Sequence, residues 1–192
     1  AAQEPVKSVA VTTKKEPTAT ASDSSSVGKL AGIVTLTGTV PELALLVKEG
    51  DSAVRDAQVC GSHNIPDESL LVKRDAGNGV ANVFVYLVKS PIKRSDSPPA
   101  EPSILDQKGC QYFPHAAVVR VGQTVQFLSS DAIAHNVHTF PKRNNAFNQT
   151  VQANSRDGIK YQYESFEVEP IEIKCDIHPW MKAWWMVLDH PY

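Results

Sequence analysis

The chain is 192 residues long and carries a formal net charge of -2, which is long enough for one domain with an extension or for two small domains. This near-neutral balance gives no electrostatic reason to expect nucleic acid or an anionic membrane as a partner. No apolar run approaches the roughly 20 residues that cross a bilayer, so we expect no membrane span.

The first 28 residues are typical of a disordered leader or tether. Residues 1–28 contain Ser, Thr, Ala, Lys, Glu and Pro, but no aromatic residue, Leu or Ile. Such a segment cannot bury enough apolar surface to offset the entropy lost on ordering. The chain begins with Ala-Ala-Gln rather than Met, as a mature product does after removal of a signal peptide, although a fragment cut at a chosen residue would look the same. This start is compatible with an exported protein, and the expectation of an exported, periplasmic protein rests mainly on the metal motif described below.

Short β-strands are predicted along the next eighty residues. Residues 29–40 are rich in β-branched residues and stop at Pro41, and residues 70–74 and 80–89 are also predicted to be strands. The run 80–89 is almost continuously apolar, which predicts a central strand. Residues 29–109 are thus interpreted as an N-terminal extension or inserted strands of one sandwich, with a separate small β module as the alternative.

The run Val118–Leu128 is interpreted as a hairpin, with its turn at Gly122 and Gln123. Continuing that pairing outward places Cys110 opposite His135, at the same end of the sheet. Residues 142–160 are polar and are predicted to form a long excursion between strands.

Further strands are predicted at residues 161–166 and 167–174. Many short strands, little helical periodicity and frequent turn residues together predict an all-β fold, an antiparallel β-sandwich.

A soft-metal motif follows the last of these strands. Cys175, His178 and Met181 are spaced as Cys-x2-His-x2-Met on one short loop. A thiolate, an imidazole and a thioether, with no carboxylate among them, select copper over magnesium or calcium. A trigonal copper site needs a second imidazole, and His135 is the best placed of the six histidines.

The three cysteines make an odd count. If Cys175 is the metal thiolate, Cys60 and Cys110 remain as a pair. In an oxidising compartment these two would form a disulfide that stabilises the fold by about 2–4 kcal/mol. Two buried, reduced cysteines are the alternative.

Two stretches carry a family resemblance. Residues 121–137, which end in Ala-His-Asn-Val, and residues 173–181, Ile-Lys-Cys-Asp-Ile-His-Pro-Trp-Met, resemble the two-part signature of the cupredoxin (type 1 blue copper) family. The short ligand loop most resembles the amicyanin- and plastocyanin-like and methylamine-utilisation-type exported proteins. The resemblance covers residues 110–190. It implies a Greek-key sandwich over residues 29–192 with a copper-binding core at 110–192, one type 1 copper per chain, and electron transfer between periplasmic redox partners.

Carried over position by position, the resemblance implies a set of four copper ligands. His135 and His178 would supply the imidazoles, Cys175 the thiolate and Met181 the long axial contact. Asn136 resembles the family residue whose amide braces the ligand loop. Three further histidines are candidates for a second shell, a second metal site or a docking surface, with ordinary hydrogen-bonded histidines as the alternative: His138, His115 and His63.

Three functions remain open from the sequence. The first is a non-enzymatic electron carrier that exchanges electrons through an exposed edge of His178. The second is a small copper enzyme with an open or second copper site that acts on a small molecule. The third is copper delivery or storage. No Gly-x-Ser-x-Gly, phosphate-binding glycine loop or His-Glu-x-x-His motif supports hydrolase chemistry.

Overall fold

The chain divides into two compact units. The computed structural model describes residues 9–13, 30–88 and 97–192. One unit contains Ala1–Leu43 and Ser69–Val83, and the other contains Ala44–Glu68 and Phe84–Tyr192. Within the described residues, no helix combines the length and apolar character that a membrane crossing requires. The domain boundaries proposed from the sequence stay predictions.

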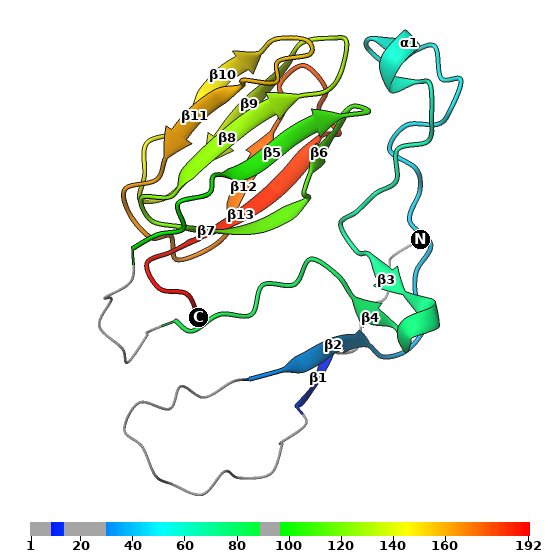
Figure 1. Cartoon of the computed structure of the whole chain (residues 1–192). Helices are drawn as coiled ribbons and strands as arrows, with labels where there is room; N and C mark the ends of the chain where they lie inside the picture. The colour runs from blue at the N-terminus through cyan, green and yellow to red at the C-terminus, as the bar shows by residue number, and fades with distance from the viewer. Residues whose placement is uncertain (1–8, 14–29, 89–96) are drawn as a thin grey trace, which may run out of the picture. The chain divides into compact units, whose positions relative to one another are not determined.

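The first unit is a small sheet with strand order β1-β2-β4-β3 (Figure 1). Strand β1 lies inside the segment predicted to be disordered, and it pairs antiparallel with β2 from Val9↔Leu36 to Thr13↔Gly32. Its β-branched valines and threonines suit an extended backbone. The rest of residues 1–28 lies outside the described residues. The elements of this unit are β1 Val9–Thr13, β2 Gly32–Leu36, β3 Val72–Lys73, η1 Arg74–Ala76 and β4 Gly79–Val80.

The prediction of a central strand at residues 80–89 is wrong. Only Gly79–Val80 form a strand, and residues 81–88 have no strand assignment. An apolar run becomes a central strand only when neighbouring strands cover it on both edges, whereas Val85 and Val88 are 71% and 83% exposed. Residue 89 and part of the following loop, residues 90–96, lie outside the described residues.

The second unit contains a β-sandwich made of two sheets (Figure 1). The five-stranded sheet has the order β10-β9-β12-β13-β7, and the four-stranded sheet has the order β11-β8-β5-β6. The all-β sandwich predicted from the sequence is confirmed. Two pairings, β5 with β8 and β7 with β13, are parallel. The strands are β5 Ser103–Lys108, β6 Gln111–Phe113, β7 Ala116–Arg120, β8 Thr124–Ser129, β9 His135–Phe140, β10 Asn148–Val151, β11 Ile159–Gln162, β12 Ile171–Lys174 and β13 Lys182–Leu188.

The core lies between the two sheets and is rich in aromatic rings. The ring centroid of Phe127 on β8 lies 4.9 Å from that of Phe147 and 5.9 Å from that of Trp185 on β13. Trp185 is fully buried, whereas the adjacent Trp184 is half-buried. Alternation along a strand predicts this difference. Residues 142–160, predicted as an excursion, contain β10 and the first residues of β11.

The hairpin predicted at residues 118–128 is wrong, because β7 and β8 belong to different sheets. Gln123 N donates to Arg120 O at 2.9 Å, and Gly122 has φ 78° at the third position of this turn. A positive φ at that position is typical of a type II turn, which splays its flanking strands instead of pairing them. The chain therefore steps from one sheet of the sandwich to the other.

Residues 44–68, called the 44–68 segment below, are tied to the sandwich. Val47 and Ile65 form a β-bridge at the base of the segment, and both are buried in the same hydrophobic cluster as the sandwich core. Helix α1, Ala57–Cys60, ends at a cysteine. The predicted disulfide between Cys60 and Cys110 is present. It joins the segment to the turn between β5 and β6.

Candidate metal centre

Three strands bring the predicted ligands together at one end of the five-stranded sheet. His135 is the first residue of β9, and Cys175 directly follows β12. Because β12 pairs with both β9 and β13, the loop from Cys175 to Met181 begins beside β9. His178 lies in the middle of that loop.

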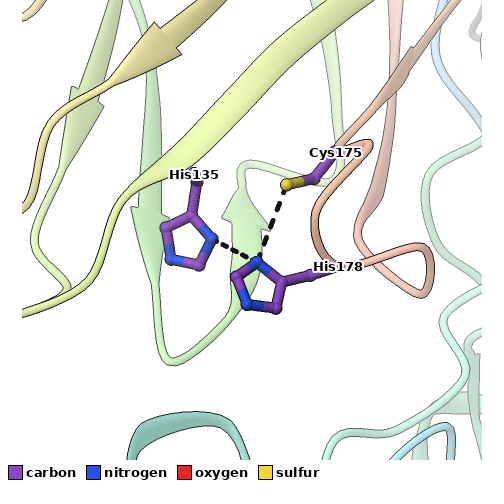
Figure 2. A group of neighbouring side chains, drawn as sticks. All are labelled: His135, Cys175 and His178. Carbon is purple, nitrogen blue, oxygen red and sulfur yellow. Dashed lines mark hydrogen bonds between the residues drawn. The ribbon is translucent and has the colours of Figure 1, made fainter. Parts of the chain in front are cut away.

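The nitrogen and sulfur atoms of this group face one another (Figure 2). His135 Nδ1 lies 2.9 Å from His178 Nδ1, and Cys175 Sγ lies 3.7 Å from the same His178 atom. The three potential ligand atoms are all within 4.8 Å of one another. All three side chains are buried, with exposed fractions of at most 1%. Two imidazoles and a thiolate are the donor set of a trigonal copper site, so the chemistry of these residues fits that metal.

Met181 ends the ligand loop and is buried. Its backbone N donates to His178 O at 2.9 Å, and its O accepts from Cys175 N at 3.3 Å. These two bonds fold the loop into a tight turn. The role of Met181 as an axial ligand stays a prediction.

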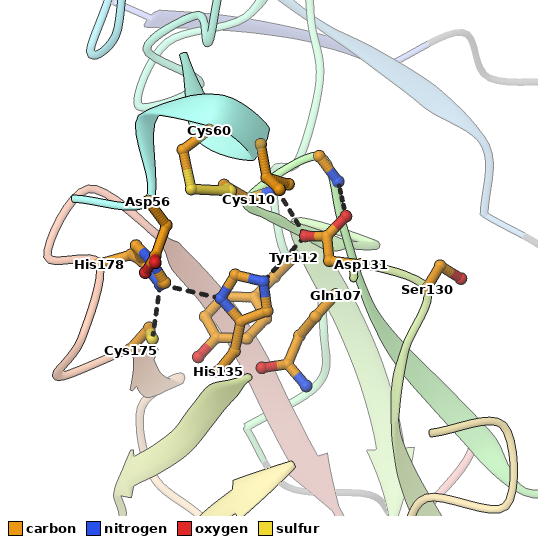
Figure 3. Close-up of polar contacts among 12 residues, drawn as sticks. Asp56, Cys60, Gln107, Cys110, Tyr112, Ser130, Asp131, His135, Cys175 and His178 are labelled. Carbon is orange, nitrogen blue, oxygen red and sulfur yellow. Dashed lines mark hydrogen bonds and ion pairs between the residues drawn. A yellow bond between two sulfur atoms is a disulfide. The ribbon is translucent and has the colours of Figure 1, made fainter. Parts of the chain in front are cut away.

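Each imidazole uses its second nitrogen to contact a carboxylate (Figure 3). His135 Nε2 lies 2.8 Å from Asp131 Oδ2, and His178 Nε2 lies 2.9 Å from Asp56 Oδ2. A carboxylate on the far nitrogen fixes the tautomer and the orientation of a metal-binding histidine and increases its basicity. The geometry therefore points both Nδ1 atoms at the proposed site.

Asp131 is itself held in place by the backbone. Its carboxylate accepts from Gly109 N at 2.6 Å and from Cys110 N at 2.8 Å. Burial opposes the charge on Asp131, but the hydrogen bonds from His135 and these two amides keep its pKa below its usual value. The result is a fixed negative charge behind His135.

The site favours a thiolate. Burial raises the pKa of Cys175, but hydrogen bonds from His135, His178 and the Asn136 amide outweigh that effect and lower the pKa to about 6. For His135, burial lowers the pKa, while hydrogen bonds with Asp131 and Cys175 raise it to about 9. Since the thiolate is the metal-binding form of cysteine, Cys175 is suited to a metal at neutral pH.

Asn136 contacts the ligand loop, and its predicted role of bracing that loop stays a prediction. Its Oδ1 accepts from Asp176 N at 2.6 Å, and its backbone N donates to Cys175 Sγ at 3.5 Å. Behind it, the Tyr112 hydroxyl donates to Asn136 O at 2.5 Å. Burial, followed by the negative charges of Cys175 and Asp176, raises the pKa of Tyr112 well above its ordinary value.

The other candidate histidines lie apart from one another. His138 Nδ1 contacts both carboxylate oxygens of Asp176 at 3.1 Å. His115 Nδ1 lies 3.4 Å from Glu68 Oε2, and His63 Nε2 lies 3.0 Å from Gly109 O. None of the three belongs to a group of three potential ligands among the residues that the structure describes. The second metal site considered from the sequence stays a prediction.

The expectation of an exposed His178 edge is wrong. The side chain is fully buried, because Asp56 of the 44–68 segment covers its Nε2 and the Trp180 ring lies 5.3 Å from it between centroids. The Trp180 indole N–H also donates to Cys110 O at 3.2 Å. The segment, the disulfide and the ligand loop thus meet over this imidazole.

Two carboxylates of the site were missed by sequence reasoning. Asp131 lies four residues before His135 in the same connection, so its proximity had a local signal. Asp56 is 122 residues away from His178, and no pattern in the sequence links the two.

Comparison with known families gives no match to this chain, and comparison with curated proteins also gives none. Solved structures do match over about half of it. A reduced amicyanin variant is 20% identical, with a TM-score of 0.40, over 49% of this chain and 94% of the amicyanin. A purple cupredoxin from Nitrosopumilus maritimus is 18% identical, with a TM-score of 0.37, over 45% of this chain and 99% of the cupredoxin.

A copper-containing nitrite reductase from Thermus scotoductus SA-01 is also similar. It is 20% identical, with a TM-score of 0.40, over 48% of this chain. The match spans only 23% of the nitrite reductase chain.

Proposed function

We propose that the chain is a type 1 copper protein that carries single electrons between redox protein partners outside the cytoplasm. The observation that carries this proposal is the buried group of His135 Nδ1, His178 Nδ1 and Cys175 Sγ within 4.8 Å. These residues would hold the copper, with Met181 as the axial ligand. When bound, copper would supply a one-electron couple between Cu(II) and Cu(I).

The protein residues would keep the copper site rigid and closed to solvent. The two imidazoles are anchored at Nε2 by carboxylates, and the backbone bonds between Cys175, His178 and Met181 hold the loop. Fixed ligands keep the reorganisation small when the charge of the centre changes. Burial of the three side chains favours a carrier over an enzyme, because no ligand face is open to a small molecule, and it favours retention of copper over delivery.

Export is part of the proposal. The Cys60–Cys110 disulfide supports it, because stable disulfides persist in oxidising compartments and are rare in the cytosol.

The visible spectrum and the copper content test the proposed function. The copper-loaded chain should bind a single copper and show an intense thiolate-to-copper band, and Cys175→Ala should lose the band. His115→Asn is the matched control, since His115 lies outside the ligand group, and it should keep both the band and the copper content. A wild-type chain loaded with copper but lacking the band would overturn the proposal.

The enzyme alternative has its own test. Azide or nitrite added to the copper-loaded chain should leave the band unchanged if the centre is closed. A shift of the band on adding either anion would instead favour a copper enzyme with an open coordination position.

A further inference from the structure

Asp56 is held rigidly where it meets His178. It directly precedes α1 and has a left-handed backbone, with φ 53°, and its O accepts from Val59 N and Cys60 N, each at 2.9 Å. Asp and Asn tolerate this conformation better than most residues. The carboxylate is thereby anchored through its own backbone.

The surrounding segment is equally constrained. Gly50 N donates to Gly61 O at 2.8 Å. A Cβ at Gly61 would lie 2.7 Å from Asp51 O and 2.8 Å from Ala57 O, so the chain packs closely on itself here. With the disulfide at Cys60 and the buried bridge at the base of the segment, the path of the 44–68 segment over the site is fixed at both ends.

The contact between Asp56 and His178 differs from its counterpart at His135. Asp131 is buried, with 6% of its side chain exposed, whereas the side chain of Asp56 is 38% exposed. His178 is nevertheless fully buried, and Asp56, which contacts its Nε2, contributes to that burial together with the Trp180 ring. Arg55 Nε lies 3.7 Å from the same carboxylate oxygen, on the solvent side.

The chemistry of the contact runs through the imidazole. When His178 Nε2 donates its proton to the carboxylate, Nδ1 carries the lone pair that would bind a metal ion placed between His178, Cys175 and His135. The carboxylate also places a negative charge one imidazole away from a bound ion. Such a charge favours the more positive oxidation state.

We propose that Asp56 is a positioning residue for the metal centre, acting through His178 from the 44–68 segment to orient its Nδ1, shield its Nε2 and lower the reduction potential of the bound copper. This inference rests on the proposed function and deepens it, because it assigns to a segment outside the ligand strands a part in tuning the site.

Two substitutions of Asp56 separate its charge from its hydrogen bond. Asp56→Asn keeps an oxygen acceptor but removes the charge, so the copper band should remain while the reduction potential rises. A tenfold loss of preference for Cu(II) corresponds to about 59 mV for a one-electron couple. Asp56→Ala removes both, and Cu(II) affinity should fall by about 10–100-fold, the usual effect of losing such a partner.

The matched control is Glu49→Gln, which removes one exposed negative charge from the same segment. It should leave the band, potential and affinity at their wild-type values. If Asp56→Ala fails to fold, the potential of Asp56→Asn decides. If both Asp56 variants keep the reduction potential and the copper affinity of the wild-type chain, the inference is overturned. This holds even if the thiolate-to-copper band of the wild-type chain supports the proposed function.

A metal-free measurement keeps the two proposals distinct. Diethyl pyrocarbonate modifies accessible imidazole nitrogens, and His138, whose side chain is 27% exposed, serves as the internal positive control. In the metal-free wild-type chain and in Glu49→Gln, His178 should stay unmodified, whereas Asp56→Ala should make it reactive. Protection of His178 that persists in Asp56→Ala would count against the shielding role, whether or not the wild-type chain binds copper.

Discussion

Removing the Cys60–Cys110 disulfide should destabilise the sandwich strongly. The bond joins positions 50 residues apart, and the chain-entropy relation for a loop of that length gives about 4 kcal/mol at 25 °C. Native domains are stable by only about 5–15 kcal/mol. The double variant Cys60→Ala/Cys110→Ala should therefore lose a large part of the free energy of unfolding.

Urea unfolding of the metal-free chain, followed by tryptophan fluorescence, measures this loss. All three tryptophans of the chain lie at residues 180–185, so the signal reports on the ligand loop and β13 and not on the first unit. Metal must be absent because a ligand that binds only the folded state adds stability of its own. Reductant should destabilise the wild-type chain and leave the double variant unchanged. A loss below about 1 kcal/mol would refute the entropic argument.

The other predictions concern ionisation, the buried carboxylates and the core. In the metal-free chain the Cys175 thiol should ionise around pH 6, as ultraviolet thiolate absorbance would show. Because the pKa of Cys175 is lowered in the folded state, the stability that the thiolate contributes is lost as pH falls through that value. Ionisation of Cys175 near pH 9 would contradict the hydrogen bonds to its sulfur. Asp131→Asn should weaken Cu(II) binding by about 10–100-fold, measured by chelator competition, and unchanged affinity would contradict its role. Glu167→Ala should cost about 3 kcal/mol or more in urea unfolding, because the buried carboxylate accepts from three successive backbone amides, residues 142–144; a cost below 1 kcal/mol would contradict it.

The ligand loop could be predicted because its information is local. Cys175, His178 and Met181 follow a strand within one short loop, and the structure folds that loop into a tight turn. His135 was the best placed of the six histidines, and the family resemblance implied the same residue. Alternating burial at Trp184 and Trp185 likewise follows from a single strand.

The hairpin prediction shows how a correct neighbourhood can follow from a wrong topology. Its register placed Cys110 near His135, and Cys110, Asp131 and His135 do lie together. The strand pairing that achieves this is different, because β5 runs parallel to β8. Asp131, which follows β8, accepts from Gly109 N, which follows β5, and contacts His135 Nε2. Sequence patterns predict strands better than they predict which sheet a strand joins.

Asp56 could not be predicted for a physical reason. Its contact with His178 depends on the path of the 44–68 segment, which is set by the bridge between Val47 and Ile65 and by the disulfide. Neither interaction has a periodic signature near Asp56. A contact that depends on interactions between residues far apart in the sequence can be identified only from the structure.

On the proposed function, the disulfide would link assembly of the metal site to oxidative folding. Before Cys60 and Cys110 pair, the segment bearing Asp56 has no covalent cross-link to the sandwich, and Cys175 is one of three thiols that compete for oxidation. Correct pairing both spares Cys175 and locks the outer partner of His178 in place. On the proposed function, the chain would complete its copper site only in a compartment where disulfides form, and copper acquired earlier would meet a site with a looser outer shell.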